Sequence, residues 1–230
     1  MSTTGLLAAS SESNRLVIWD VEERKPTYVC PSQNNQIHIK QLEFHQSEMY
    51  VLCATFDTRS NLVNISSYTI SDGDVTYKIE YNCKQGTEYK NFLITSDEMY
   101  LVVYRNDKKN DSLAIHTAMD GAFLHNVKLA YMNYKEDFIS MIPMYKSPHL
   151  IAIIDLDKGN LINVRDKKFI RSVPKWNGRA TKDDKHGLYA PSRGGLELLD
   201  LKSTKQVKIF IPKIAEGVFD VDTLITPNDK

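Results

Sequence analysis

Short apolar runs separated by polar turns recur along the chain. Met49–Ala54 (MYVLCA) and Met99–Tyr104 (MYLVVY) are two such runs, and each is followed by a polar turn and a second run. Apolar runs of this length, bounded by turn residues, predict β-strands. Apolar and polar positions alternate over Val75–Tyr81, which predicts a half-buried outer strand. No stretch keeps a helical period over three turns, so an all-β fold is expected.

The runs return at a spacing of about 50 residues, in the range of sheet-forming repeats. A polar segment precedes each return, as in His45–Glu48 and Thr95–Glu98, and a weaker apolar strand such as Ile39–Phe44 precedes the polar segment. About four strands per repeat predict a β-propeller, because each four-stranded blade then covers an apolar face of its neighbour. A β-sandwich is the alternative, but it does not explain the regular return of the polar segment.

The repeats predict one propeller region over residues 1–230 with about five four-stranded blades. The predicted blades are residues 1–35, 36–85, 86–134, 135–176 and 177–212, followed by a final inner strand at 219–226. Two arrangements remain open. The final strand completes the first blade and closes a five-bladed ring, or the chain is an incomplete arc of a larger ring. An open arc would expose apolar blade faces, which predicts self-association.

Ser13–Pro26 (SNRLVIWDVEERKP) resembles the third strand and following turn of a WD40 repeat, whose hallmark is the Trp-Asp pair seen here at Trp19-Asp20. The corresponding pairs in later repeats are Tyr68-Thr69, His116-Thr117, Val164-Arg165 and Leu199-Asp200. The repeats are also similar to the C-terminal propeller of NACHT- and WD-repeat-containing proteins. That resemblance implies a sensor half of an oligomerising nucleotide switch. No GxxxxGK[ST] phosphate loop occurs in the chain.

The amino-acid composition limits the classes of partner that are expected. The chain is 42% hydrophobic and 25% charged, and its 29 basic residues balance its 29 acidic ones. A nucleic-acid partner is not expected without a basic excess, and no apolar run approaches the roughly 20 residues of a membrane-spanning helix. Residues 1–15 lack the features of a signal peptide. Three cysteines without a CxxC pair are typical of a reducing compartment, so a cytoplasmic location is expected.

The chemistry favours a non-enzymatic, WD40-like propeller that acts as a protein-interaction scaffold or sensor. The histidines do not pair at metal-binding spacings, and neither a metal nor a cofactor is expected. Candidate partner-binding residues lie on turns between second and third strands, of which Arg105–Asp111 is expected to be the longest, and on connections between blades. They are Asp57, Arg59, Arg105, Lys108, Tyr134, Trp176 and Arg193. The alternative is a five-bladed glycoside-type hydrolase, with turn carboxylates such as Asp57, Asp155 and Asp157 facing the channel.

Overall fold

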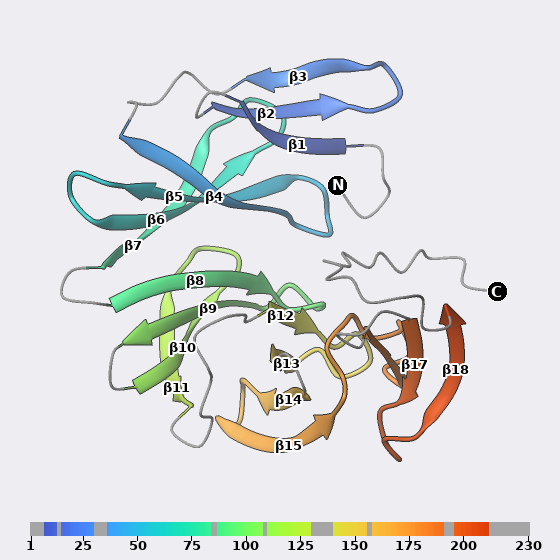
Figure 1. Cartoon of the computed structure of the whole chain (residues 1–230). Helices are drawn as coiled ribbons and strands as arrows, with labels where there is room; N and C mark the ends of the chain where they lie inside the picture. The colour runs from blue at the N-terminus through green and yellow to red at the C-terminus, as the bar shows by residue number, and fades with distance from the viewer. Residues whose placement is uncertain are drawn as a thin grey trace. The chain divides into compact units, whose positions relative to one another are not determined.

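The computed structural model describes residues 7–12, 15–29, 36–83, 87–107, 110–129, 140–155, 158–190 and 196–211. Within these ranges the chain forms strands and turns and no helix (Figure 1), which confirms the all-β prediction. The strands form five antiparallel sheets, each made of strands that follow one another in the chain. The chain divides into two compact units. The first comprises Met1–Ile94 and Glu98–Leu129, and the second comprises Thr95–Asp97 and Ala130–Lys230.

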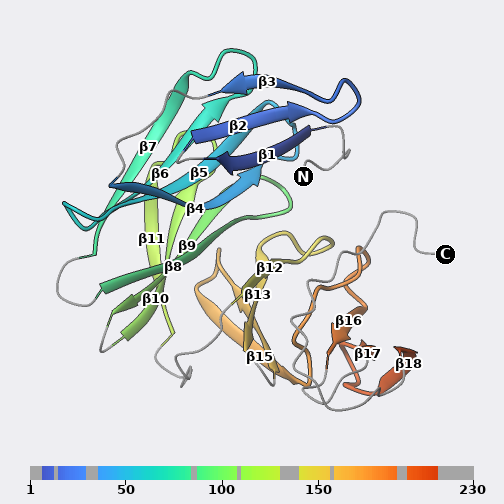
Figure 2. The same ribbon diagram turned by 45° about the horizontal axis from the view of Figure 1, so that its top comes forward.

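The first unit holds three sheets. Its strands are β1 (Leu7–Glu12), β2 (Arg15–Asp20) and β3 (Lys25–Val29) in the first sheet, β4 (Ile37–Phe44), β5 (Tyr50–Asp57), β6 (Leu62–Thr69) and β7 (Val75–Asn82) in the second, and β8 (Thr87–Ile94), β9 (Tyr100–Asp107), β10 (Asn110–Thr117) and β11 (Phe123–Lys128) in the third. The second sheet lies between the other two (Figure 2).

The second unit holds two sheets. Its strands are β12 (Ser140–Pro143), β13 (Leu150–Asp155), β14 (Lys158–Asn163) and β15 (Lys168–Pro174) in the fourth sheet, and β16 (His186–Tyr189), β17 (Leu196–Asp200) and β18 (Gln206–Ile211) in the fifth. The predicted final strand at 219–226 lies outside the described residues.

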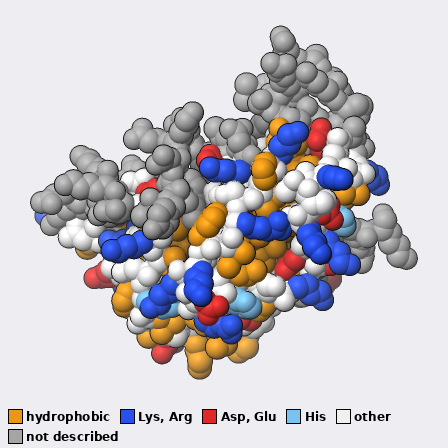
Figure 3. All heavy atoms as spheres, turned by 90° about the horizontal axis from the view of Figure 1, so that it is seen from below, with side chains coloured by type: hydrophobic (Ala, Val, Ile, Leu, Met, Phe, Trp, Pro, Cys, Tyr) orange, Lys and Arg blue, Asp and Glu red, His pale blue; other side chains and the backbone are white. Residues whose placement is uncertain are grey.

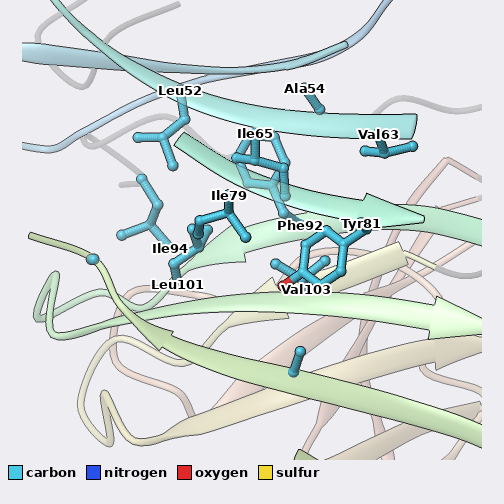
Figure 4. Close-up of a cluster of buried hydrophobic side chains, with 12 residues drawn as sticks. Leu52, Ala54, Val63, Ile65, Ile79, Tyr81, Phe92, Ile94, Leu101 and Val103 are labelled. Carbon is cyan, nitrogen blue, oxygen red and sulfur yellow. The ribbon is translucent and has the colours of Figure 1, made fainter. Parts of the chain in front are cut away.

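Strand β5 shows why its apolar residues run consecutively instead of alternating. Val51 and Cys53 pack in a cluster with the first sheet, whereas Leu52 and Ala54 pack in a cluster with the third sheet (Figure 4). Side chains of a strand point to opposite faces in turn, so a sheet covered on both faces needs apolar residues at every position. Stacked sheets therefore account for runs such as MYVLCA.

One outer turn recurs in all five sheets. The turn follows the third strand of each repeat, which is the second described strand (β2 and β17) in the first and fifth sheets. The side chain of the residue that ends this strand forms a hydrogen bond with the residue three positions later. The residue four positions after the strand end has a positive φ. The strand-end residues are Asp20, Thr69, Thr117, Asn163 and Asp200, and the positive-φ residues are Arg24, Gly73, Gly121, Lys167 and Thr204. A register shift just before each strand end completes the pattern.

This turn corrects one predicted correspondence. In the fourth sheet the equivalent of Trp19-Asp20 is Ile162-Asn163, two residues before the predicted pair Val164-Arg165. The side chain of Asn163 takes the role of the aspartate, since its Oδ1 accepts a hydrogen bond from the Asp166 N–H at 2.8 Å. The side-chain oxygen of asparagine accepts the same backbone N–H of the turn as that of aspartate. The turn therefore needs a hydrogen-bond acceptor at this position and does not need an aspartate.

Neighbouring sheets are tied at their outer edges by a repeated contact. The residue eight positions after the strand end reaches the outer turn of the next sheet and donates to a backbone carbonyl there. Tyr77 OH lies 2.9 Å from Ala118 O in the first unit, and Arg171 Nη2 lies 2.6 Å from Leu201 O in the second. Different side chains thus satisfy the same carbonyl position of a repeated turn.

The inner strands of the second and third sheets are joined by one amide. Gln41 Nε2 donates to Phe92 O at 2.8 Å, and Gln41 Oε1 accepts from Phe92 N at 3.0 Å and from Tyr89 OH at 2.9 Å. A primary amide can pair with a peptide group as a strand does. Gln41 therefore fixes β4 against β8 where the sheets converge.

Candidate partner-binding surface

Asp57 and Arg59 occupy the hairpin turn between β5 and β6. Asp57 Oδ1 accepts the Arg59 N–H at 2.9 Å, and Asp57 Oδ2 accepts the Ser60 hydroxyl at 2.7 Å. The Ser60 hydroxyl, followed by the Arg59 N–H, holds the pKa of Asp57 below its usual value. The carboxylate therefore shapes the turn, and the side chain of Arg59 is left exposed at the tip.

Arg105 lies in a strand, which corrects the prediction of a long turn over Arg105–Asp111. It belongs to β9 and pairs with Ser112 of β10. Its guanidinium carbon stacks 5.0 Å from the ring centre of Tyr81, and its Nε is buried without a hydrogen-bond partner among the described residues. Strands pair through backbone hydrogen bonds, which do not depend on the side chains. The polar side chains of this segment therefore suggested a turn where the backbone forms a strand. Arg105 is half-buried and contributes to the packing of the second sheet against the third.

Trp176 is completely buried, with a relative exposure of 0%, which contradicts the expectation of an exposed anchor. It packs in the core of the second unit with Ile154 and Leu201. Two glycines make room for its ring. A Cβ at Gly159 would lie 2.3 Å from Trp176 Cε3, and a Cβ at Gly187 would lie 2.5 Å from Trp176 Nε1. The loop-like sequence around Trp176 describes its backbone correctly, but the side chain turns inward between two sheets.

The other candidates lie outside the described residues. These are Lys108, Tyr134 and Arg193, together with Asp157 of the alternative hydrolase interpretation. Asp155, which belongs to the same interpretation, ends β13 and is half-buried. Of the seven predicted binding residues, the structure thus shows Arg59 exposed, Asp57 in the turn beneath it, and Arg105 and Trp176 in packing roles.

The inner turns, which join the first and second strands of a sheet, form contacts that the sequence-based predictions did not include. Glu98, in the turn before β9, accepts a hydrogen bond from Ser47 N at 3.1 Å and pairs with His45 at 2.8 Å, and both partners lie in the equivalent turn of the preceding sheet. The triplet Glu-Met-Tyr, which occurs at positions 48–50 and again at 98–100, is the sequence feature that marks these two turns as equivalent. Both methionines of these triplets are 61% exposed.

A pair of titratable groups, His116 and Tyr81, is buried between the second and third sheets. His116 is 4% exposed, its Nδ1 lies 2.9 Å from Gly121 O, and its Nε2 meets the hydroxyl of Tyr81. Burial lowers the pKa of His116, so the ring is neutral, with Nδ1–H donating to the carbonyl and Nε2 accepting from the tyrosine. Among the described residues no group of three His, Cys, Asp or Glu side chains is arranged to hold a metal ion.

Comparison with known families decides the wider assignment. A family model described as the NWD2 C-terminal beta-propeller matches residues 1–230. The chain belongs to this family. The five antiparallel sheets are consistent with an NWD2-type propeller. The family match also confirms the resemblance to NACHT- and WD-repeat-containing proteins that the sequence indicated. No curated protein matches the chain.

The surface of this NWD2-type propeller carries both hydrophobic and charged side chains. Large hydrophobic side chains reach the surface between lysines and arginines on the face shown in Figure 3. Exposed examples on outer strands are Val75, Phe123, Leu124, Phe169, Ile170 and Val207. Among the described residues, no helix is long and apolar enough to cross a membrane.

Proposed function

We propose that this chain is a non-enzymatic protein-interaction module, a scaffold or sensor that contacts partners through the hairpin turns between second and third strands. Its membership of a propeller family supports an interaction role. The observation that carries the proposal is the turn at Asp57, where a carboxylate consumed by local hydrogen bonds holds Arg59 exposed at the tip. Arginine is enriched among interface anchors.

The same observation argues against Asp57 as the general acid of a glycosidase. A general acid needs a raised pKa, whereas the pKa of Asp57 is lowered by its turn donors. Lys108, Tyr134 and Arg193 remain proposed contacts on the grounds of sequence. Arg105 and Trp176 act, in this proposal, only by supporting the sheets that carry the turns.

Quantitative proximity labelling in cells tests the proposal. Wild type, Arg59→Ala and the control Arg165→Ala are compared, since Arg165 is also an exposed arginine. We expect Arg59→Ala to lose specific neighbours that Arg165→Ala keeps, with unchanged thermal unfolding of both variants. Identical neighbours for all three proteins would reject the turn as a binding surface. Hydrolysis of aryl glycosides that disappears in Asp57→Asn would reject the non-enzymatic assignment.

A further inference from the structure

Four turns, at residues 45–49, 70–74, 95–99 and 118–122, meet at one end of the second and third sheets. Ile70 N donates to Met49 O at 2.9 Å, and Ala118 N donates to Met99 O at 3.1 Å, so each inner turn lies beside the outer turn of its own sheet. Glu98 joins the two inner turns through Ser47 N. Tyr77 joins the two sheets through Ala118 O. These bonds make one continuous surface from residues that are far apart in the chain.

Exposed methionines stand on this surface. Met49 and Met99 are each 61% exposed and occupy equivalent positions in the two inner turns, and Met119, in the outer turn of the third sheet, is 90% exposed. Side chains this exposed bury only a small part of their apolar surface within the folded chain. Methionine is flexible and polarisable, so a set of exposed methionines suits binding of varied apolar side chains.

The charged side chains of these four turns, His45 aside, are all acidic. The same four turns contain Glu48, Asp72, Asp74, Asp97, Glu98 and Asp120, and they contain no lysine or arginine. Hydrogen bonds from the hydroxyls of Thr69 and Thr117 hold the pKa values of Asp72 and Asp120 below their usual range, so both stay ionised at neutral pH. His45 is paired with Glu98. The surface is therefore apolar in patches and acidic around them.

We propose that this methionine face, made of Met49, Met99 and Met119 with the carboxylates of Asp72, Asp74 and Asp120, binds a basic amphipathic segment of a partner protein. The apolar side of such a segment covers the methionines, and its lysines or arginines meet the carboxylates. The proposal rests on the proposed role as an interaction module and adds to it the chemistry of the partner. It uses the end of the sheets opposite to the turn that holds Arg59.

A synthetic peptide tests this surface directly. The probe is a fluorescent amphipathic helix of about 20 leucine and lysine residues, and its matched control carries glutamate in place of lysine. We expect the lysine peptide to bind the full chain, the glutamate peptide not to bind, and the affinity to fall with added salt, because complementary charges are screened. The variant Met49→Gln/Met99→Gln/Met119→Gln should weaken binding about tenfold or more.

A matched variant controls for loss of exposed apolar surface in general. Phe169→Gln/Val207→Gln alters two exposed hydrophobic residues of the second unit and should bind the lysine peptide as wild type does. Asp74→Asn should weaken binding without changing the unfolding midpoint. Equal affinity of the methionine variant and wild type, or no binding of the lysine peptide, overturns the proposal. So does a dimer of wild type that the methionine variant dissociates, since the occupant would then be a second copy.

The two proposals fail separately. Loss of peptide binding in the methionine variant, with neighbours unchanged by Arg59→Ala, would uphold the methionine face and reject the hairpin turn. Neighbours lost by Arg59→Ala, with no binding of the lysine peptide to wild type, would uphold the interaction module and reject the methionine face.

Discussion

Glu98 Oε1 lies 2.8 Å from Nδ1 of His45, a residue of the equivalent turn one repeat earlier. In the second unit, Asp184 is the counterpart of Glu98 and accepts hydrogen bonds from the backbone N–H groups of Tyr145, Lys146 and Ser147. Glu98 and Asp184 both have positive φ, at 59°. An acidic residue at this turn position thus holds the turn of the preceding sheet in both units.

Replacing Asp184 by glycine should destabilise the second unit by about 1–2 kcal/mol, because charge-assisted hydrogen bonds to three backbone donors are lost. Glycine tolerates positive φ, so backbone strain does not contribute. Thr204→Gly is the matched control, since Thr204 has the same φ of 59°. Urea unfolding followed by circular dichroism measures the difference. Equal midpoints for the two glycine variants would show that the Asp184 bonds do not stabilise the fold.

Gly187→Ala should destabilise the second unit by about 1–3 kcal/mol, the typical cost of overpacking a core. The added methyl would lie 2.5 Å from Trp176 Nε1 and 2.7 Å from a methyl group of Leu201. Thermal unfolding, with the fluorescence of buried Trp176 as a second signal, measures the effect. Arg179→Ala, at an exposed position of the same connection, should leave the midpoint in place. An unchanged midpoint for Gly187→Ala would contradict the tight packing around Trp176.

Stability should fall as the pH drops below about 6.5, the ordinary pKa of histidine. Burial lowers the pKa of His116 in the folded chain, so the unfolded chain binds the proton more readily. The contribution of His116 is therefore complete above the unfolded pKa and is lost as the pH falls through the folded one. Urea unfolding between about pH 8 and pH 5 measures this slope. In His116→Asn the slope should be shallower, and an equal slope would assign the pH dependence to other groups.

Tyr77→Phe should cost about 0.5–1.5 kcal/mol, because the phenol donates a hydrogen bond to Ala118 O that phenylalanine leaves unmade. Burial raises the pKa of Tyr77 to about 12, so the hydroxyl stays protonated and able to donate over the whole working range. Chemical denaturation of the full chain measures the loss. Tyr145→Phe is the control, since Tyr145 is an exposed tyrosine. The same small change in both variants would mean that the tie between the second and third sheets contributes nothing.

The binding candidates show where prediction from sequence failed. Trp176 and Arg105 have side chains typical of interfaces, and both stand in segments of polar, loop-like composition. Their side chains nevertheless pack between sheets, Trp176 beside Gly159 and Gly187, and Arg105 on the ring of Tyr81. The direction of a side chain depends on what the neighbouring sheet leaves vacant, and local composition does not contain that information.

The sequence by itself determined the strands, their repeat and the propeller family. Consecutive apolar runs such as Val51–Ala54 require a sheet covered on both faces, and turn residues such as Asp72-Gly73 end each strand. Only the tertiary structure decided which residues join neighbouring sheets. The pairing of His45 with Glu98, and the backbone hydrogen bonds that bring the turns of Met49, Met99 and Met119 together, both depend on how neighbouring sheets stack. Strand formation follows from local pattern, whereas contacts between sheets follow from register and spacing over about 50 residues.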